Sequence, residues 1–419
     1  MASELPPFSG ENWSSGSGSQ FLQSLLGNLL KLVNNKNPLQ LDLLRQLAYS
    51  IATDGKEETN TDPLERIRWE QLAHLAELHV SQLTGLPGYP HGLEVVTVTR
   101  SEWTWRTIEA WKSLFEIMAT SLLDTGAKQG GEAGSLPAEL TGEEYLTGAD
   151  QLSFLASQWM TAMAPALISL QLGSAIGYLA RESLGQYDLL PIPRPNKGEL
   201  VVVTSNVHAF AEQWSLQLED VMLWVCLTET TFETIMAKDH VRTELDDLIR
   251  SYVSAFKSER VNPEIFGDLS SYDFTDMDSM AAAIEDPIAF LDKIETEEQR
   301  YIRRKLDTVV ATMQAYVADI AEQAGKQLIG TYTPISEASR RARMERGVLS
   351  RMAERIFGMD LSMEMLAKAT AFIKGVKDRG GEEMLIRLWS EPGHFPTPAE
   401  LEAPGLWLER INLDTNLDT

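Results

Sequence analysis

One segment, residues 218–236, constrains the fold more than any other part of the chain. It reads Leu-Glu-Asp-Val-Met-Leu-Trp-Val-Cys-Leu-Thr-Glu-Thr-Thr-Phe-Glu-Thr-Ile-Met. Its apolar side chains recur close to the period of an α-helix. A helix with this much apolar surface must be covered by other elements. We therefore expect a central helix over residues 218–237 that buries Val221, Met222, Val225, Phe232 and Met236.

Helical spacing also dominates the rest of the chain, beginning with an apolar stripe from Leu22 to Val33. Asp62 and Pro63 are typical of a helix start, and Gly85 of a helix end. Further helices are expected over residues 39–52, 63–85, 101–118, 149–184, 240–256, 295–328, 336–358 and 362–380, and one is expected to begin within 212–217. Only residues 93–99 and 199–204 have the β-branched character of strands. The sequence thus predicts a mainly α (α+β) fold with a small sheet beside the central helix.

Composition shifts along the chain suggest four regions. Residues 1–19 are rich in serine and glycine and predict a disordered tail. Residues 20–148 predict an N-terminal helical region with one short strand, ending in a mobile linker from 125 to 148. Residues 149–330 predict the core that carries the central helix. Residues 331–419 predict a C-terminal helical region that ends in a proline-rich tail.

The net charge excludes several classes of partner. The 419 residues include 61 acidic and 36 basic ones, for a net charge of −25. Nucleic acids and anionic membranes are bound by clustered cations, so neither is expected as a partner. No run approaches the ~20 apolar residues of a membrane span, and the N-terminus lacks the pattern of a signal peptide, so we expect a cytoplasmic protein.

The single cysteine, Cys226, excludes an intramolecular disulfide and a cysteine-rich zinc site. Its apolar neighbours on the central helix indicate an inert buried thiol. We likewise expect the tryptophans to belong to the core rather than to a ligand platform; they are Trp103, Trp105, Trp111, Trp214 and Trp224. Motifs for a serine nucleophile elbow, a dinucleotide fold and a P-loop are missing from the sequence.

Short segments in a fixed order resemble the zincin-like metallopeptidase type 2 family of bacteria, whose members often carry the label of hydrolase. The resemblance spans about Leu25 to Leu413. The matching segments are Thr99-Arg-Ser-Glu-Trp103, Leu170-Gln-Leu-Gly173, Leu184-Gly-Gln-Tyr-Asp188, Val201-Val-Val-Thr-Ser-Asn206, Trp224-Val-Cys-Leu227, His240-Val-Arg-Thr-Glu-Leu245, Tyr252-Val-Ser-Ala-Phe256, Arg346-Gly347 and Leu401-Glu-Ala-Pro-Gly-Leu-Trp-Leu-Glu-Arg410. The resemblance implies a multi-helix zincin-like fold and descent from a zinc hydrolase.

In a zincin the central helix carries H-E-x-x-H, whose two histidines bind zinc while the glutamate activates a water. Here the corresponding positions are Thr228, Glu229 and Phe232. The glutamate is present and both histidines are replaced. Glu229 is therefore either a retained general base or a relic held by a neighbouring hydroxyl such as that of Thr230 or Thr231.

The resemblance implies a third ligand in a later segment, similar to E-G-Y-V-D-H in the family. That segment is Gln314-Ala-Tyr-Val-Ala-Asp319 here, so the glutamate position holds Gln314 and the histidine position holds Asp319. We expect no zinc. One alternative is a hard cation such as Ca²⁺, Mg²⁺ or Mn²⁺ held by Glu229, Glu233, Gln314 and Asp319. Against it, a chain with 61 acids presents such pairs by chance on solvated faces.

Other charged residues have simpler interpretations. His208 and His240 flank the central helix and are expected to cap or pack. The basic run Arg340-Arg-Ala-Arg343, with Arg346, Arg351 and Arg355, either docks an anionic partner or pairs with the chain's own acids, such as those of residues 273–286. We expect the internal pairing.

Three functions remain open from the sequence. The first is a degenerate zincin-like protein that has lost its zinc site and acts as a binding or scaffold protein for a small molecule, peptide or protein. The second is a hydrolase that uses a hard divalent cation or Glu229 in the same cleft. The third is a helical protein that acts through homo-oligomerisation. The sequence favours the first, because the framework resembles the family while the ligand positions do not.

Overall fold

The computed structural model describes residues 39–89, 91–129, 168–255, 295–359 and 361–417. Helices dominate these residues, and two short strands form one sheet. The predicted mainly α fold is confirmed. Within these ranges, no helix is both long and apolar enough to cross a membrane.

The first half of the chain alternates long helices with the two strands. Its elements are α2 Leu41–Thr53, α3 Pro63–Thr84, β1 Glu94–Val98, α4 Arg100–Gln129, β2 Glu199–Val203, α6 Thr204–Gln213, α7 Leu218–Met236 and α8 Asp239–Ser254. Residues 168–182 are helical as well. The second half is all helical, with α12 Glu297–Leu328, α13 Tyr332–Met344, α14 Val348–Ile356, α15 Met363–Gly380, α16 Glu383–Ser390, α17 Pro398–Glu402 and α18 Pro404–Leu417.

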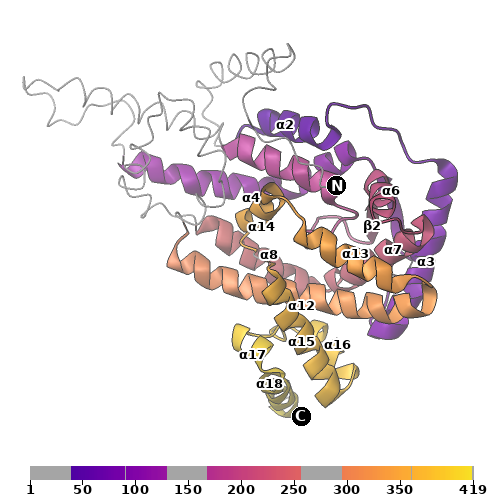
Figure 1. Cartoon of the computed structure of the whole chain (residues 1–419). Coiled ribbons are helices and arrows are strands. Elements are labelled where there is room, and N and C mark those ends of the chain that lie inside the picture. Colours follow the sequence, from indigo (N-terminus) through magenta and orange to yellow (C-terminus); the bar gives the residue numbers. More distant parts are fainter. Residues whose placement is uncertain (1–38, 90, 130–167, 256–294, 360, 418–419) are drawn as a thin grey trace, which may run out of the picture.

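Helix α7 lies at the centre, as predicted. It contacts α3, α6, α12 and β2 (Figure 1). The five side chains expected on its buried face, from Val221 to Met236, are all at most 1% exposed. Helix α12 packs against the same helix and also contacts α8 and α15, so most of the core is arranged around these two helices.

The sheet joins segments that are far apart in sequence. Strands β1 and β2 pair in parallel, from Glu94 opposite Glu199 to Val98 opposite Val203. The other edge of β2 is occupied by the segment around Gly185, which forms an isolated bridge with Val202. The amide of Val203 also donates to the carbonyl of Leu184 at 2.9 Å. Strand β2 thereby fixes the position of residues 184–187 beside α7.

Helix ends follow their sequence signals. Asp62 caps α3 by accepting a hydrogen bond from the amide of Leu64 at 2.7 Å, and Gly85 ends that helix with a φ of 62°. Thr296 and Gln299 form a reciprocal capping box at the start of α12. The predicted start and end of α3 are confirmed.

Several boundaries were predicted wrongly. Residues 204–213 form α6, although a helix was expected to begin only at 212. The helix expected over 336–358 is two helices, α13 and α14. The proline-rich tail contains α16, α17 and α18, because Pro398 and Pro404 occupy first turns, where proline lacks only an amide that would be unsatisfied anyway.

The linker prediction was partly wrong, since α4 continues through residues 125–129. The rest of the linker, the tail 1–19, the stripe 22–33 and the acidic residues 273–286 lie outside the described residues. The region boundaries at 148/149 and 330/331 stay predictions. Trp105 is 51% exposed and so is not a core residue, whereas Trp103 and Trp111 are buried. Trp214 and Trp224 are partly buried against the core.

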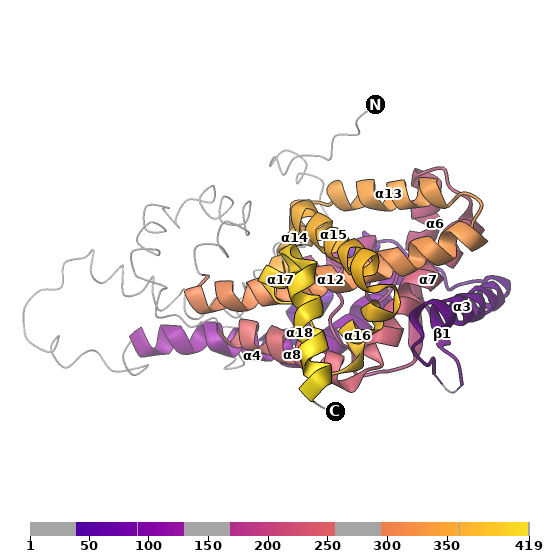
Figure 2. The same cartoon turned by 90° about the horizontal axis from the view of Figure 1, so that it is seen from below.

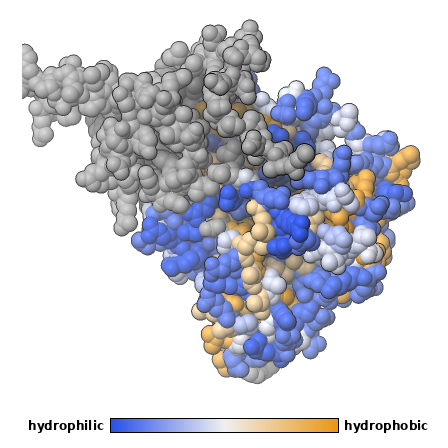
Figure 3. Space-filling view, viewed as in Figure 1, coloured by the Kyte–Doolittle hydropathy of each residue, from blue (hydrophilic) through white to orange (hydrophobic). Residues whose placement is uncertain are grey.

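The surface agrees with the acidic composition. On the uncovered part of the face in Figure 3, hydrophilic residues cover most of the surface, and hydrophobic residues form narrow patches between them. A large interface between two copies of the chain usually needs a broad apolar area. This part of the surface does not supply one.

Candidate functional site

Glu229 on α7 is anchored by backbone amides rather than by side-chain hydroxyls. It is 2% exposed. Its Oε2 accepts hydrogen bonds from the amides of Gln186 at 2.9 Å and Tyr187 at 3.1 Å, and its Oε1 lies 3.2 Å from the Tyr187 amide. The prediction that Thr230 or Thr231 would hold this carboxyl group is wrong. Thr231 donates to its own helix at the carbonyl of Leu227, which is 2.6 Å away.

Gly185 allows this close approach. A β-carbon built on Gly185 would lie 2.4 Å from Cδ and 2.6 Å from Cγ of Glu229. Both distances are far shorter than an ordinary carbon–carbon contact. The carbonyl of Gly185 also accepts a hydrogen bond from Nε1 of Trp103 at 2.8 Å. Strand β2, Trp103 and Glu229 therefore hold the same short loop from three sides.

The groups around Glu229 act on its pKa in opposite directions. Burial raises the pKa of this carboxyl group well above its usual range, and the nearby carboxylate of Asp188 raises it further. The amides of Gln186 and Tyr187 and the guanidinium of Arg194 act in the opposite direction. A general base has to be within reach of water. A carboxyl group that is 2% exposed and bound to two backbone amides does not meet this condition.

Neither of the two positions that correspond to zinc-binding histidines is available to a metal. One side chain is hydrogen-bonded within its own helix, and the other is packed in the core. Thr228 is half-buried and donates its hydroxyl to the carbonyl of Val225 at 3.0 Å. Phe232 is 1% exposed, and its ring centroid lies 5.9 Å from that of Tyr187. Neither side chain offers a lone pair that would bind zinc well.

The third ligand position faces a guanidinium group. Gln314 on α12 donates to the carbonyl of Asp188 at 3.4 Å and accepts a hydrogen bond from Nη2 of Arg343 at 3.1 Å. Arg343 belongs to α13, which folds back along α12 (Figure 2). Arg346, which follows α13, pairs with Glu354 at 3.0 Å. Burial and the charge of Arg346 lower the pKa of Arg343 to about 10, so the side chain remains cationic at neutral pH.

The basic run therefore has a role that sequence reasoning missed. Internal pairing with the chain's own acids was expected, and Arg340 and Arg341 do pair with Glu337 on their own helix, at 2.9 and 2.6 Å. The acids given as an example, those of residues 273–286, lie outside the described residues. Arg343 points inward to the candidate site. Its distance from Gln314 in sequence leaves no local signal for this contact.

Glu233 and Asp319 each have separate partners. Glu233 accepts hydrogen bonds from the hydroxyls of Tyr89 at 2.6 Å and Tyr187 at 3.0 Å, and from the amide of Gly198 at 2.7 Å. Asp319 is paired with Nζ of Lys377, which lies 3.0 Å from each carboxylate oxygen. Tyr187 thus connects Glu233 to Glu229, whereas Asp319 is tied to α15.

The side chains proposed as ligands of a hard cation therefore bind different protein groups. Within the described ranges, no group of three or more histidine, cysteine, aspartate or glutamate residues is arranged to hold a metal ion. Each carboxylate of the proposed set, those of Glu229, Glu233 and Asp319, already accepts hydrogen bonds from the protein. A cation at this place would have to displace them.

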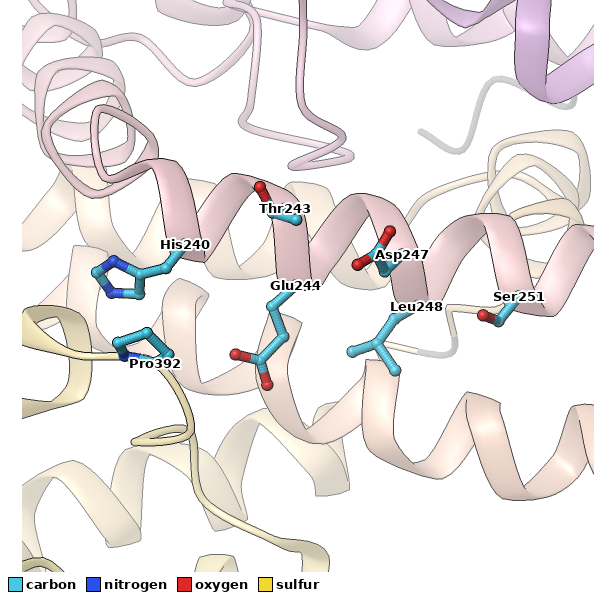
Figure 4. Close-up of a pocket in the computed structure, with 7 residues that line it drawn as sticks. All are labelled: His240, Thr243, Glu244, Asp247, Leu248, Ser251 and Pro392. Carbon is cyan, nitrogen blue, oxygen red and sulfur yellow. The ribbon is translucent and has the colours of Figure 1, made fainter.

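The remaining candidates lie outside this cluster. Cys226 is fully buried, and burial raises the pKa of its thiol. His208 contacts Glu65 at 2.9 Å. His240 lines a groove of about 370 Å³ along α8, where Glu244 points towards the loop that holds Pro392 (Figure 4). The groove is lined by His240, Thr243, Glu244, Asp247, Leu248, Ser251 and Pro392, none of which belongs to α7.

Comparison with known proteins places this geometry in context. A family model described as zincin-like metallopeptidase matches residues 40–408. The crystal structure of a putative hydrolase with a novel fold from Chloroflexus aurantiacus matches with a TM-score of 0.61 and 19% identity, over 89% of this chain and 99% of that chain. At this identity the likeness shows a shared fold. No curated protein matches the chain.

Proposed function

Because the chain belongs to the zincin-like metallopeptidase family, we propose that it is a catalytically degenerate member that has lost its zinc site. It acts as a binding or scaffold protein, with a small molecule, a peptide or another protein as its partner. The observation that carries this proposal is the contact of Arg343 with Gln314. The guanidinium of Arg343 donates to the side-chain oxygen of Gln314, which stands at the third ligand position.

The donor set supports the same conclusion. Zinc in proteins takes imidazole, thiolate or carboxylate ligands, usually in a tetrahedral arrangement. Thr228 donates to its own helix and Phe232 has no donor atom. The amide oxygen of Gln314 is occupied by Arg343, whose charge would also repel a metal ion. The residues present therefore do not fit zinc.

The retained glutamate has a structural role in this proposal. Glu229 binds the amides of residues 186 and 187, and Tyr187 in turn reaches Glu233. The former active-site helix then serves as a rigid centre for the fold. We place the protein in the cytoplasm, where a lone buried cysteine such as Cys226 is ordinary.

The test is the metal content of the purified full-length chain, measured by mass spectrometry before and after dialysis against a mild chelator. We expect no stoichiometric zinc. A second measurement follows zinc binding to the variant Thr228→His, Phe232→His, Gln314→Glu. We expect weak binding, because Arg343 would form an ion pair with the introduced carboxylate. Adding Arg343→Met should strengthen zinc binding by about tenfold or more.

A matched control adds Arg340→Met instead, which removes the same charge from an exposed position. This change should leave zinc binding as weak as in the triple variant. Stoichiometric zinc in the unmodified chain that resists the chelator would overturn the proposal. Peptide hydrolysis by the unmodified chain, dependent on Mg²⁺ or Mn²⁺ and abolished by Glu229→Gln, would establish the hydrolase alternative instead.

A further inference from the structure

Arg194 is a buried guanidinium that forms no hydrogen bond to a carboxyl group among the described residues, although the charges of Glu229 and Asp188 act on it. The side chain is 6% exposed, and its Nε and Nη2 atoms have no hydrogen-bond partner in the part of the chain that the structure describes. Its Cζ lies 5.3 Å from the ring centroid of Trp103 and 5.5 Å from that of Trp111. The two indole rings attract the cation through their faces, but they accept no conventional hydrogen bond.

Further unsatisfied polar atoms belong to the same neighbourhood. Trp103, Thr107 and Trp111 are spaced four residues apart and so share one face of α4. Oγ1 of Thr107 and Nε1 of Trp111 are buried and make no hydrogen bond within the described ranges. Nε2 of Gln186 is also buried and makes no hydrogen bond among the described residues. Gln186 directly follows Gly185, whose carbonyl accepts the hydrogen bond from Trp103. These five residues, Trp103, Thr107, Trp111, Gln186 and Arg194, are the Arg194 cluster.

Unsatisfied buried groups of this kind usually mark a bound water or ligand. All residues of the cluster are at least nine-tenths buried, with Thr107 at 0% and Gln186 at 5% exposed. Each buried donor left without a partner costs about 1–3 kcal/mol. Five such atoms in one cluster, two of them on Arg194 itself, are therefore unlike a packed apolar core, where polar atoms are avoided.

The chemistry of the cluster favours an anion. The unsatisfied atoms of Arg194, Trp111 and Gln186 can only donate hydrogen bonds, and the Thr107 hydroxyl can donate as well. The nearby acceptor is Oδ1 of Asp188, which also lacks a partner among the described residues. Burial lowers the pKa of Arg194 to about 10, so it remains charged at neutral pH. An arginine fork between flat rings matches the planar shape of a carboxylate.

We propose that the Arg194 cluster binds one small carboxylate anion, of the size of acetate, through the donors of Arg194, Trp111 and Thr107. This site goes beyond the proposed function, since it requires neither zinc nor an active Glu229. The proposed ligand is an anion, whereas the metal that the family binds is a cation. A water molecule could satisfy single donors, whereas the two oxygens of a carboxylate can accept from several donors at once.

The experiment measures binding of acetate to the full-length chain by saturation-transfer NMR, in a buffer with chelator and constant ionic strength. Acetamide, which has the same shape without the charge, is the neutral control. We expect saturable binding of acetate and none of acetamide. Arg194→Met should weaken acetate binding about tenfold or more, whereas the exposed Arg340→Met should leave it unchanged.

Arg194→Met can be checked for folding by circular dichroism. If it does not fold, Thr107→Val removes one hydroxyl while keeping the charge, and it should weaken binding severalfold. Equal binding of acetate and acetamide, failure of acetate to bind, or unchanged binding in a folded Arg194 or Thr107 variant would overturn the proposal. The chelator keeps this result separate from the zinc measurement, which alone decides the proposed loss of the metal site.

Discussion

Replacing Gly185 by alanine should destabilise the fold through a single identifiable contact. The new β-carbon would lie 2.4 Å from Cδ, 2.5 Å from Oε1 and 2.6 Å from Cγ of Glu229. Glu229 cannot move aside freely, because its carboxyl group is fixed by the amides of Gln186 and Tyr187. Overpacking of a buried site costs about 1–3 kcal/mol, and we expect the upper end of that range.

A double-mutant cycle isolates this contact. Glu229→Ala alone leaves the two amides without their acceptor and opens a void, at a cost of about 2–4 kcal/mol. It also removes the atoms that an alanine at position 185 would strike. The double variant should therefore be more stable than the sum of the single changes predicts, by about 2 kcal/mol.

Calorimetric melting of the four proteins measures the effect, since a cost of about 3 kcal/mol shifts the midpoint of a protein of this size by several degrees. Gly330→Ala is the matched control, because a β-carbon there meets no atom within 4 Å. If Gly185→Ala melts like this control, or if the costs in the double variant simply add, the close approach of Gly185 to Glu229 is refuted.

Three further predictions concern the same helix. Burial raises the pKa of Glu229, so the folded chain holds this proton more tightly than the unfolded chain does. Stability from this group is fully present below the unfolded pKa of about 4.3 and is lost as the pH rises towards the folded value. Urea unfolding should therefore show Glu229→Gln gaining stability relative to the native chain as the pH rises above about 5, and a constant difference would contradict the shift. Phe232→His should lower stability by about 2–4 kcal/mol in the same assay, because it replaces a buried apolar ring by a smaller polar ring. Cys226 should react with a thiol reagent only after unfolding, because its thiol is buried, and fast reaction of the folded chain would show an open helix face.

The local part of the fold could be predicted from the sequence. The apolar period of α7, the cap at Asp62 and the β-branched runs of β1 and β2 are signals that lie within a few residues of the feature they specify. The individual helices of the proline-rich C-terminus, α16, α17 and α18, were not predicted. Pro398 is tolerated by α17 because of its place in the first turn, and composition alone does not reveal that place.

The contacts of the site could not be predicted in this way. The resemblance identified Glu229, Gln314 and their neighbours, but not the groups that bind them. Arg343 reaches Gln314 from another helix, and Gly185 reaches Glu229 from a loop held by β2. Periodicity describes one helix at a time, so it carries no information on which arginine or which glycine meets a given side chain.

The pairing of β1 with β2 has a consequence for how the chain folds. The two strands come from segments roughly a hundred residues apart, so their association must close a long loop before any ladder bond forms. Contacts of such high sequence separation form slowly compared with helices. The loop of residues 184–187, which binds Glu229, is hydrogen-bonded to β2 and can adopt its final position only once that strand has formed. The candidate site should therefore be among the last parts to assemble, and mutations there should speed unfolding more than they slow folding.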